Sequence, residues 1–286
     1  MKIAIKVVIA FLFILFSANL NAQSKVVVKD SIDAKKENKF EFNVDLLNRY
    51  LWRGQCWGGD YVVVQPTITF AATNKITVGF WATSNFKSDY FYPDGETAYK
   101  GYQEIDFNIN YQMAPFLSVQ LWDYYWPSIS KVEGVDNGFF NYGNNGVKTV
   151  DLMFVFDFSE YKLPLYATLS TLVAGNDFRY DSSGENPKQN YTTYFEGGYT
   201  LEELYKKVTF DVLAGVIFNN DAAYYSYADY DKTSLINLSL KAKREFKLTE
   251  RVVMPVSLNY IHNAAKENTE VFGRNFLVTG ISLNFK

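Results

Sequence analysis

The sequence predicts an all-β protein, a transmembrane antiparallel up-and-down β-barrel of about 12 strands. Three observations predict this fold. An export signal stands at the N-terminus, the segments that follow alternate apolar and polar residues, and the connections between them are alternately short and long. After residue 22 no stretch approaches the 18 apolar residues of a transmembrane helix, so strands are expected to cross the membrane.

The N-terminal 22 residues have the organisation of a secretory signal peptide. Lys2 and Lys6 form a basic region, residues 7–16 are apolar, and small residues offer a cleavage site after Ala22. We therefore expect residues 1–22 to be cleaved. Residues 23–38 are charged and expected to form a flexible periplasmic segment, and residues 39–286 are expected to form the barrel.

Charge and residue counts exclude several classes of function. Removal of the signal peptide takes away two lysines and no acid, so the net charge falls from −3 to −5 and nucleic-acid binding is not expected. The single cysteine, Cys56, cannot form an internal disulfide, and it is interpreted as a loop residue. With one histidine besides, the chain predicts no transition-metal site and no cofactor.

The strands are predicted by alternation with a period of two. In "EIDFNINYQ", residues 104–112, apolar side chains occupy every second position and polar side chains occupy the others. Most of the predicted strands are longer than those of soluble sheets, as tilted membrane strands are. Their expected ranges are 39–53, 61–72, 75–86, 100–113, 116–127, 147–158, 164–175, 190–201, 206–218, 233–246, 252–262 and 274–285.

The connections also alternate, in length. The short ones are 73–74, 114–115, 159–163, 202–206 and 247–251. The long ones, rich in Gly, Asn, Asp, Ser and Tyr, are 54–60, 87–99, 128–146, 176–189, 219–232 and 263–273. Outer-membrane barrels have short periplasmic turns and long external loops, so this pattern predicts both the fold and its orientation.

The two faces of the strands are expected to meet different surroundings. The apolar face should meet lipid, and the polar face should line a narrow lumen. The residues expected to line the pore are Arg49, Arg53, Gln65, Glu104, Asp106, Asp151, Lys241 and Lys243. By the same alternation Tyr50 and Trp52 are expected on the lipid side, in an aromatic girdle at the outer interface.

Other candidate sites have weaker signals. His262 ends a strand, near Ser257 and Asn263 but without a nucleophile motif, so a structural or interfacial role is favoured over a catalytic one. The acidic loops 181–185 and 229–231 do not have the ligand spacing of an EF-hand, so solvated loops are favoured over calcium sites. The tyrosine-rich loop 222–230 fits a sugar- or partner-binding surface and an interfacial girdle equally well.

The stretch "YLWRGQ" is followed by "VVVQPTITF" and then by "VGFWATSNF". Over residues 42–126 this order resembles the TorF family of porin-like proteins, which opens its barrel with an aromatic-x-x-Arg-Gly motif, then a Gln, then a Trp-(Ala/Gly)-Ser stretch. The matching residues are Tyr50, Arg53, Gly54, Gln65, Trp81, Ala82 and Ser84, with Thr83 interrupting the last motif. The resemblance implies a porin whose substrate is poorly defined.

The function expected from these features is passive diffusion of small solutes or ions through a narrow polar lumen in the outer membrane of a Gram-negative bacterium. Arg49 and Arg53 are expected to face Glu104 and Asp106 across it, giving a transverse field. The alternative is a non-conducting barrel that binds a ligand or partner through its long loops. The third interpretation is a lipid-modifying enzyme, but the protein is not expected to be an enzyme. The expected partners are outer-membrane lipid, small solutes or ions and the barrel-assembly machinery.

Overall fold

The structure is a computed structural model that describes residues 39–87, 101–127, 133–205, 207–218, 225, 233–265 and 273–285. The predicted signal peptide and the segment 23–38 lie outside the described residues. Within the described part of the chain, no helix has both the length and the apolar character needed to cross a membrane.

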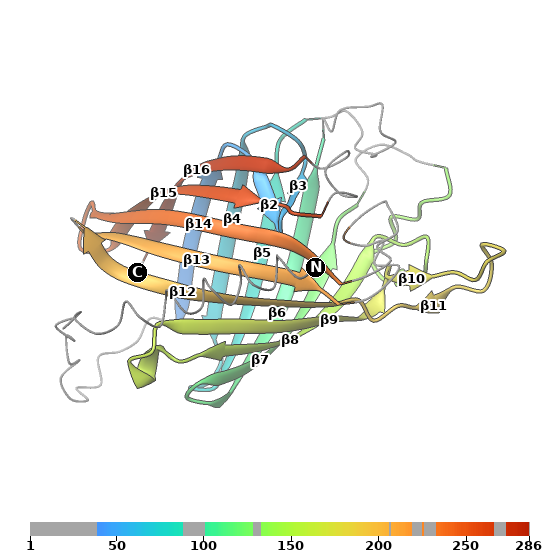
Figure 1. Cartoon of the computed structure of the whole chain (residues 1–286), viewed down its shortest axis with the longest axis horizontal. Helices are drawn as coiled ribbons and strands as arrows, with labels where there is room; N and C mark the ends of the chain where they lie inside the picture. Colours follow the sequence, from blue (N-terminus) through green and yellow to red (C-terminus); the bar gives the residue numbers. More distant parts are fainter. Residues whose placement is uncertain are drawn as a thin grey trace, which may run out of the picture. The chain divides into compact units, whose positions relative to one another are not determined.

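Twelve strands of the described chain form one closed antiparallel barrel, which confirms the predicted fold class (Figure 1). Around the wall the order is β1-β16-β15-β14-β13-β12-β9-β8-β7-β6-β5-β4, so each strand pairs with its neighbours in sequence and β1 closes the wall against β16. The strands are β1 (Phe40–Leu47), β4 (Val63–Ala71), β5 (Ile76–Ser84), β6 (Gln103–Ala114), β7 (Leu117–Tyr125), β8 (Lys148–Asp157), β9 (Leu165–Gly175), β12 (Thr193–Tyr205), β13 (Val208–Ile217), β14 (Ser234–Lys247), β15 (Val252–His262) and β16 (Asn275–Phe285).

The alternation in sequence becomes two faces of the wall. In β6, Phe107, Ile109 and Tyr111 are 44%, 52% and 44% exposed, whereas the intervening polar residues point inward and are less exposed. The ladder keeps this register across strands, because Ile109 lies opposite Val78 on β5 and Leu121 on β7. The outer face is therefore apolar and the inner face is mostly polar.

Short elements outside the wall complete the described chain. The 3-10 helix η2 (Ser159–Tyr161) connects β8 to β9 at the short-turn end. At the long-loop end, β10 (Phe178–Arg179) and β11 (Lys188–Gln189) form a small hairpin that projects beyond the barrel strands (Figure 1).

The first predicted strand, 39–53, is too long. β1 ends at Leu47, and the amide side chain of Asn48 takes over the pairing with β16. It donates to the carbonyl of Leu277 at 3.1 Å and accepts from the backbone N–H of Thr279 at 2.9 Å. The chain then leaves the wall, and residues 50–57 form a separate two-stranded sheet of β2 (Tyr50–Trp52) and β3 (Gln55–Trp57).

Candidate functional site

The hairpin of β2 and β3, residues 50–57, is called the lumen hairpin here because its contacts lie inside the barrel. Its turn is Arg53-Gly54, and both residues have positive φ, 48° and 81°. Two-residue hairpin turns of type I′ require this conformation at both central positions, and Gly is favoured there. A Cβ on Gly54 would lie 1.9 Å from the carbonyl oxygen of Ile236 on β14, so no other residue fits this close approach.

The tip of the lumen hairpin reaches the opposite wall. Arg53 Nη2 lies 3.0 Å from Asp151 Oδ2 on β8, and the Arg53 guanidinium lies 4.7 Å from the ring centre of Tyr194 on β12. Four wall strands separate β1 from β8 along one side, and four separate β1 from β12 along the other. The hairpin therefore crosses the interior from the side where β1 ends to the far wall.

Other hydrogen bonds hold the tip in place. Asn263 Nδ2, from the end of β15, donates to the carbonyl of Gly54 at 3.2 Å. Gln55 is fully buried and its amide donates to the carbonyl of Tyr225. The Tyr225 hydroxyl in turn bonds to the guanidinium of Arg53. These contacts join the hairpin to segments more than 150 residues further along the chain.

Asp151 is the anchor on the far wall. Its side chain is fully buried, and that of Arg53 is 9% exposed. Besides Arg53, Asp151 accepts hydrogen bonds from the hydroxyls of Tyr124 at 3.1 Å and Ser170 at 2.7 Å. A buried ion pair is tolerated when further hydrogen bonds satisfy its atoms, and this one meets that condition.

Around the hairpin the interior is filled by apolar and aromatic side chains. One cluster comes from β7, β9, β12, β13 and β14 with Tyr225 and Ala265, and a second contains Tyr50, Val63 and Tyr102. All five tryptophans of the chain pack against these clusters: Trp52, Trp57, Trp81, Trp122 and Trp126. The barrel is thus closed to a wide channel at this level.

The predicted lipid-facing girdle of Tyr50 and Trp52 is wrong. Tyr50 is 7% exposed and packs beside Trp81 and Tyr102, with ring centres 5.4 Å and 5.8 Å away. The Trp52 ring stacks on that of Tyr225 at 5.1 Å. The physical reason is the departure of the chain from the wall after Leu47: beyond that point alternation no longer separates lipid from lumen.

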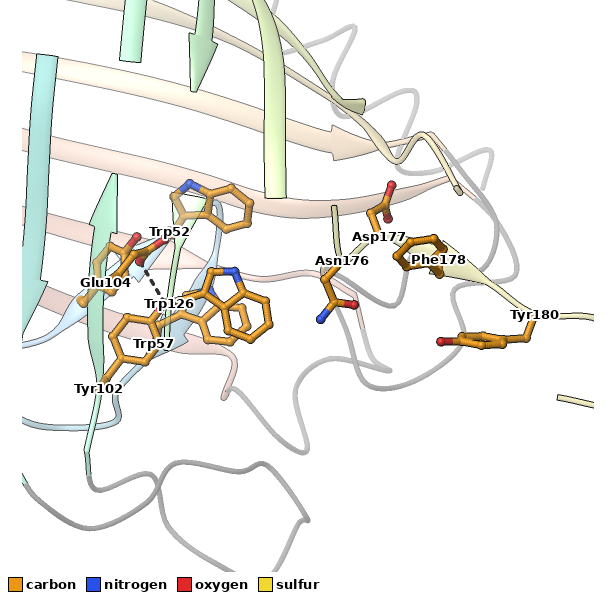
Figure 2. Close-up of a pocket in the computed structure, with 10 residues that line it drawn as sticks. Trp52, Trp57, Tyr102, Glu104, Trp126, Asn176, Asp177, Phe178 and Tyr180 are labelled. Atoms are coloured by element: carbon orange, nitrogen blue, oxygen red, sulfur yellow. Dashed lines mark hydrogen bonds between the residues drawn. The ribbon is translucent and has the colours of Figure 1, made fainter. Parts of the chain in front are cut away.

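A pocket of about 200 Å³ lies beside the lumen hairpin (Figure 2). One side is made by the aromatic rings of Tyr50, Trp52, Trp57, Tyr102 and Trp126, together with Glu104. The other side is made by Asn176, Asp177, Phe178 and Tyr180, from the segment that leaves β9. Figure 2 shows Tyr102 hydrogen-bonded to Glu104, at 2.9 Å, next to the three tryptophan rings.

The predicted pore-lining residues on β4 and β6 have local partners. Gln65 is buried and donates to the hydroxyl of Thr83 at 3.2 Å. Glu104 and Asp106 are 6% and 3% exposed and stand side by side on the inner face. Asp106 accepts from the backbone N–H of Tyr125 at 3.4 Å.

The basic residues predicted to line the pore also lie beside acidic ones. Lys241 lies opposite Asp211 in the β13–β14 ladder, and Lys243 is 3.2 Å from Glu245. Arg49 forms an ion pair with Asp60 at 2.6 Å. Of the eight residues predicted to line the pore, Arg53 and Asp151 form an ion pair with each other. The expected arrangement, with both arginines facing Glu104 and Asp106, is not formed.

The remaining candidates are also placed. His262 Nδ1 lies 2.8 Å from Asn275 Oδ1 on the outer face of β15, whereas Ser257 is five residues earlier and so on the inner face. The two side chains therefore form no nucleophile–base pair. Asp181 accepts hydrogen bonds within its own turn, from the backbone N–H groups of Ser183 and Glu185, both at 3.0 Å. Residues 229–231 lie outside the described residues.

No cluster of His, Cys, Asp and Glu fit to hold a metal occurs in the described ranges. Cys56 is in β3 rather than in a loop, and it is 4% exposed. It packs with Ile261, Phe276 and Val278.

The fold thus defines a closed twelve-stranded barrel with a hairpin docked inside it. No protein-family model matches the chain, and a comparison with curated proteins found no match. Among solved structures, the chain is similar to the NanC porin, with 10% identity, 86% of this chain and 99% of that chain covered, and a TM-score of 0.48. LpxR from Salmonella typhimurium is 12% identical, with 86% and 99% covered and a TM-score of 0.43. An outer membrane channel from Pseudomonas putida F1 is 11% identical, with 86% and 94% covered and a TM-score of 0.43. Because these TM-scores are below 0.5, the function proposed next rests on the residues of this chain.

Proposed function

We propose that this protein is an outer-membrane barrel through which small solutes or ions pass passively, and that the lumen hairpin narrows its path at the long-loop end. Two properties of the wall support insertion in a membrane. A closed barrel leaves no unpaired edge strand, and the outer face carries a belt of exposed apolar residues among the described strands. The short turns would face the periplasm and the long loops the exterior.

The inner face towards the short-turn end supports a hydrated lumen. Polar side chains from neighbouring strands are hydrogen-bonded to each other there, as Thr200 to Asp211 at 2.6 Å and Ser239 to Asn259 at 2.7 Å. Lys241 and Lys243 lie on the same face. Polar side chains of this kind keep a lumen wet and tune which ions pass.

The observation that carries the proposal is the ion pair between Arg53 and Asp151. It fixes the hairpin across the interior. On this proposal, solutes pass through a narrow path beside the hairpin. On this proposal the Arg-Gly of "YLWRGQ", the motif that resembles the TorF family, is the turn that forms the constriction.

Planar-bilayer recordings test this function. Purified wild-type protein is expected to give small, discrete current steps, and Asp151→Asn, which releases Arg53, is expected to give steps several-fold larger. Silence from both proteins, each shown to be folded by heat-dependent gel migration, contradicts the pore. The absence of current would favour the second candidate function, a non-conducting barrel that binds a ligand. The buried contacts of the hairpin, which fill part of the interior, support that candidate.

A further inference from the structure

The pocket beside the lumen hairpin has the composition of a binding site. Rings from three separate places in the chain converge on it: Tyr50, Trp52 and Trp57 from the hairpin, Tyr102 just before β6, and Trp126 just after β7. Figure 2 shows the rings of the three tryptophans and Tyr102 grouped on one side of the pocket, with Asn176, Asp177 and Phe178 on the other. Small-molecule sites are concave, largely apolar and aromatic, and carry a few convergent polar groups.

The charge of the pocket has one sign. Glu104 and Asp177 both line it, they are 6% and 2% exposed, and the described residues that line it include no lysine or arginine. The hydrogen bond that Glu104 accepts from the Tyr102 hydroxyl brings no positive charge, because that hydroxyl is neutral. Asp106, two residues further along β6 on the same face, is a third acidic side chain and interacts electrostatically with Glu104.

Three basic side chains of the hairpin segment and β8 are already paired with acidic ones, and Arg179, between two lining residues, is exposed and is not part of the lining. Lys148, which acts on Asp106 electrostatically, forms its ion pair with Asp123. Arg53 is paired with Asp151, and Arg49 with Asp60. The buried carboxylate of Glu104 therefore faces an aromatic pocket without a counter-charge from the described residues.

We propose that this pocket binds an organic cation, an ammonium group attached to an aromatic or alkyl body. The ammonium group would lie against Glu104, and the body would lie among the rings of Trp52, Trp57 and Trp126. The faces of aromatic rings attract cations, tryptophan most strongly, and the attraction grows when water is excluded. An organic anion would be repelled by Glu104 and Asp177. A neutral ligand would leave the buried carboxylate of Glu104 without a counter-charge.

Organic cations would then be the class of solute that passes through the pore. This role in transport rests on the proposed function. Binding itself does not require conduction, so the two can fail separately. Calorimetric titration of the purified full chain measures binding, and block of the bilayer current measures the effect on passage.

The probes are benzyltrimethylammonium, benzyl alcohol and benzoate, which share a ring and differ in charge. Benzyltrimethylammonium is expected to bind saturably, and the other two at least tenfold more weakly. Glu104→Gln is expected to weaken the binding of the cation tenfold or more. Trp57→Leu, which keeps the charge and removes one ring face, is expected to weaken it as well and serves if the Glu104 variant fails to fold.

The matched control is Glu41→Gln, the same change at an exposed position near the start of β1. It is expected to leave the affinity for benzyltrimethylammonium unchanged. Equal affinity for benzyl alcohol, or no saturable binding of the cation by folded protein, overturns the proposal. Binding of the cation by a protein that carries no current supports the pocket and overturns the pore.

Discussion

Arg53 and Asp151 are 98 residues apart in the sequence, yet their side chains meet at 3.0 Å inside the barrel. Arg53 comes from a hairpin that follows the first strand, and Asp151 from β8 on the far wall. The pair converts a loop expected outside the membrane into a structure that crosses the lumen. Stability, conductance, ion selectivity and thiol reactivity each report on this arrangement.

Asp151→Asn is expected to destabilise the barrel by about 3–5 kcal/mol, because it leaves the buried guanidinium of Arg53 without a counter-charge. The measurement is the free energy of unfolding in lipid vesicles, from a urea titration followed by tryptophan emission. Lys243→Gln is the control, since Lys243 and Glu245 are 36% and 55% exposed, and its expected effect is below about 1 kcal/mol. Equal stability of the Asp151→Asn variant and the wild type contradicts the role given to the pair.

Gly54→Ala is expected to displace the lumen hairpin. The new Cβ would overlap the carbonyl of Ile236, and the residue would keep a φ of 81°. Gly184→Ala is a matched control, because Gly184 has a φ of 77° but no atom within 4 Å of an added Cβ. We expect the Gly54 variant to lose at least about 2 kcal/mol more than the control, and to conduct more current. Similar behaviour of the two variants would show that the close approach is not needed.

Cation preference is expected in a potassium chloride gradient, because Glu104 and Asp106 form no ion pair within the described ranges whereas Arg49 and Arg53 are paired. The double change Glu104→Gln with Asp106→Asn should move the reversal potential towards zero. Glu250→Gln is the control, since Glu250 is 90% exposed and paired with Lys247 in a short turn. Anion preference of the wild type, or an unmoved reversal potential in the double variant, rules out this origin of selectivity.

Cys56 is expected to be unreactive in the folded protein. Burial raises the pKa of its thiol to about 12, so hardly any thiolate exists at a pH of about 8, and the side chain is also covered. A membrane-impermeant maleimide should therefore label Cys56 only after unfolding in denaturant. Rapid labelling of the native barrel at the same pH would mean that the hairpin leaves its docked position.

Most of the wall could be predicted from the sequence, and the reason is visible in β6. From Glu104 to Gln112 every side chain lies on the face that its alternation predicts, because a strand in a wall has only two faces. The same rule failed at Tyr50 and Trp52. Aromatic residues fit a lipid girdle and a packed interior equally well, and nothing in "YLWRGQ" shows that the chain has left the wall.

The site was predicted only in part. Arg53 and Asp151 were both placed on the polar face, but their contact depends on the curvature of the closed barrel and on where the hairpin docks. Tyr194 gave no signal, and Tyr225 was noticed only as part of the tyrosine-rich loop 222–230, whereas it is buried beside the guanidinium of Arg53. The sequence held one local clue. In "YLWRGQCW" the Arg-Gly pair lies between two three-residue segments that each end in Trp, and such a pair is suited to a two-residue hairpin turn.

The position of the hairpin in the chain has a consequence for assembly. It follows the first strand, while its partners on β8, β12 and β14 are made later, and the wall closes when β16 pairs with β1. The tip of the hairpin contacts strands on both sides of the interior, so its full set of contacts exists only after those strands have taken their places in the wall. The Arg53–Asp151 contact is therefore a marker of assembly, because it forms only in a chain whose wall has been completed at least to β8.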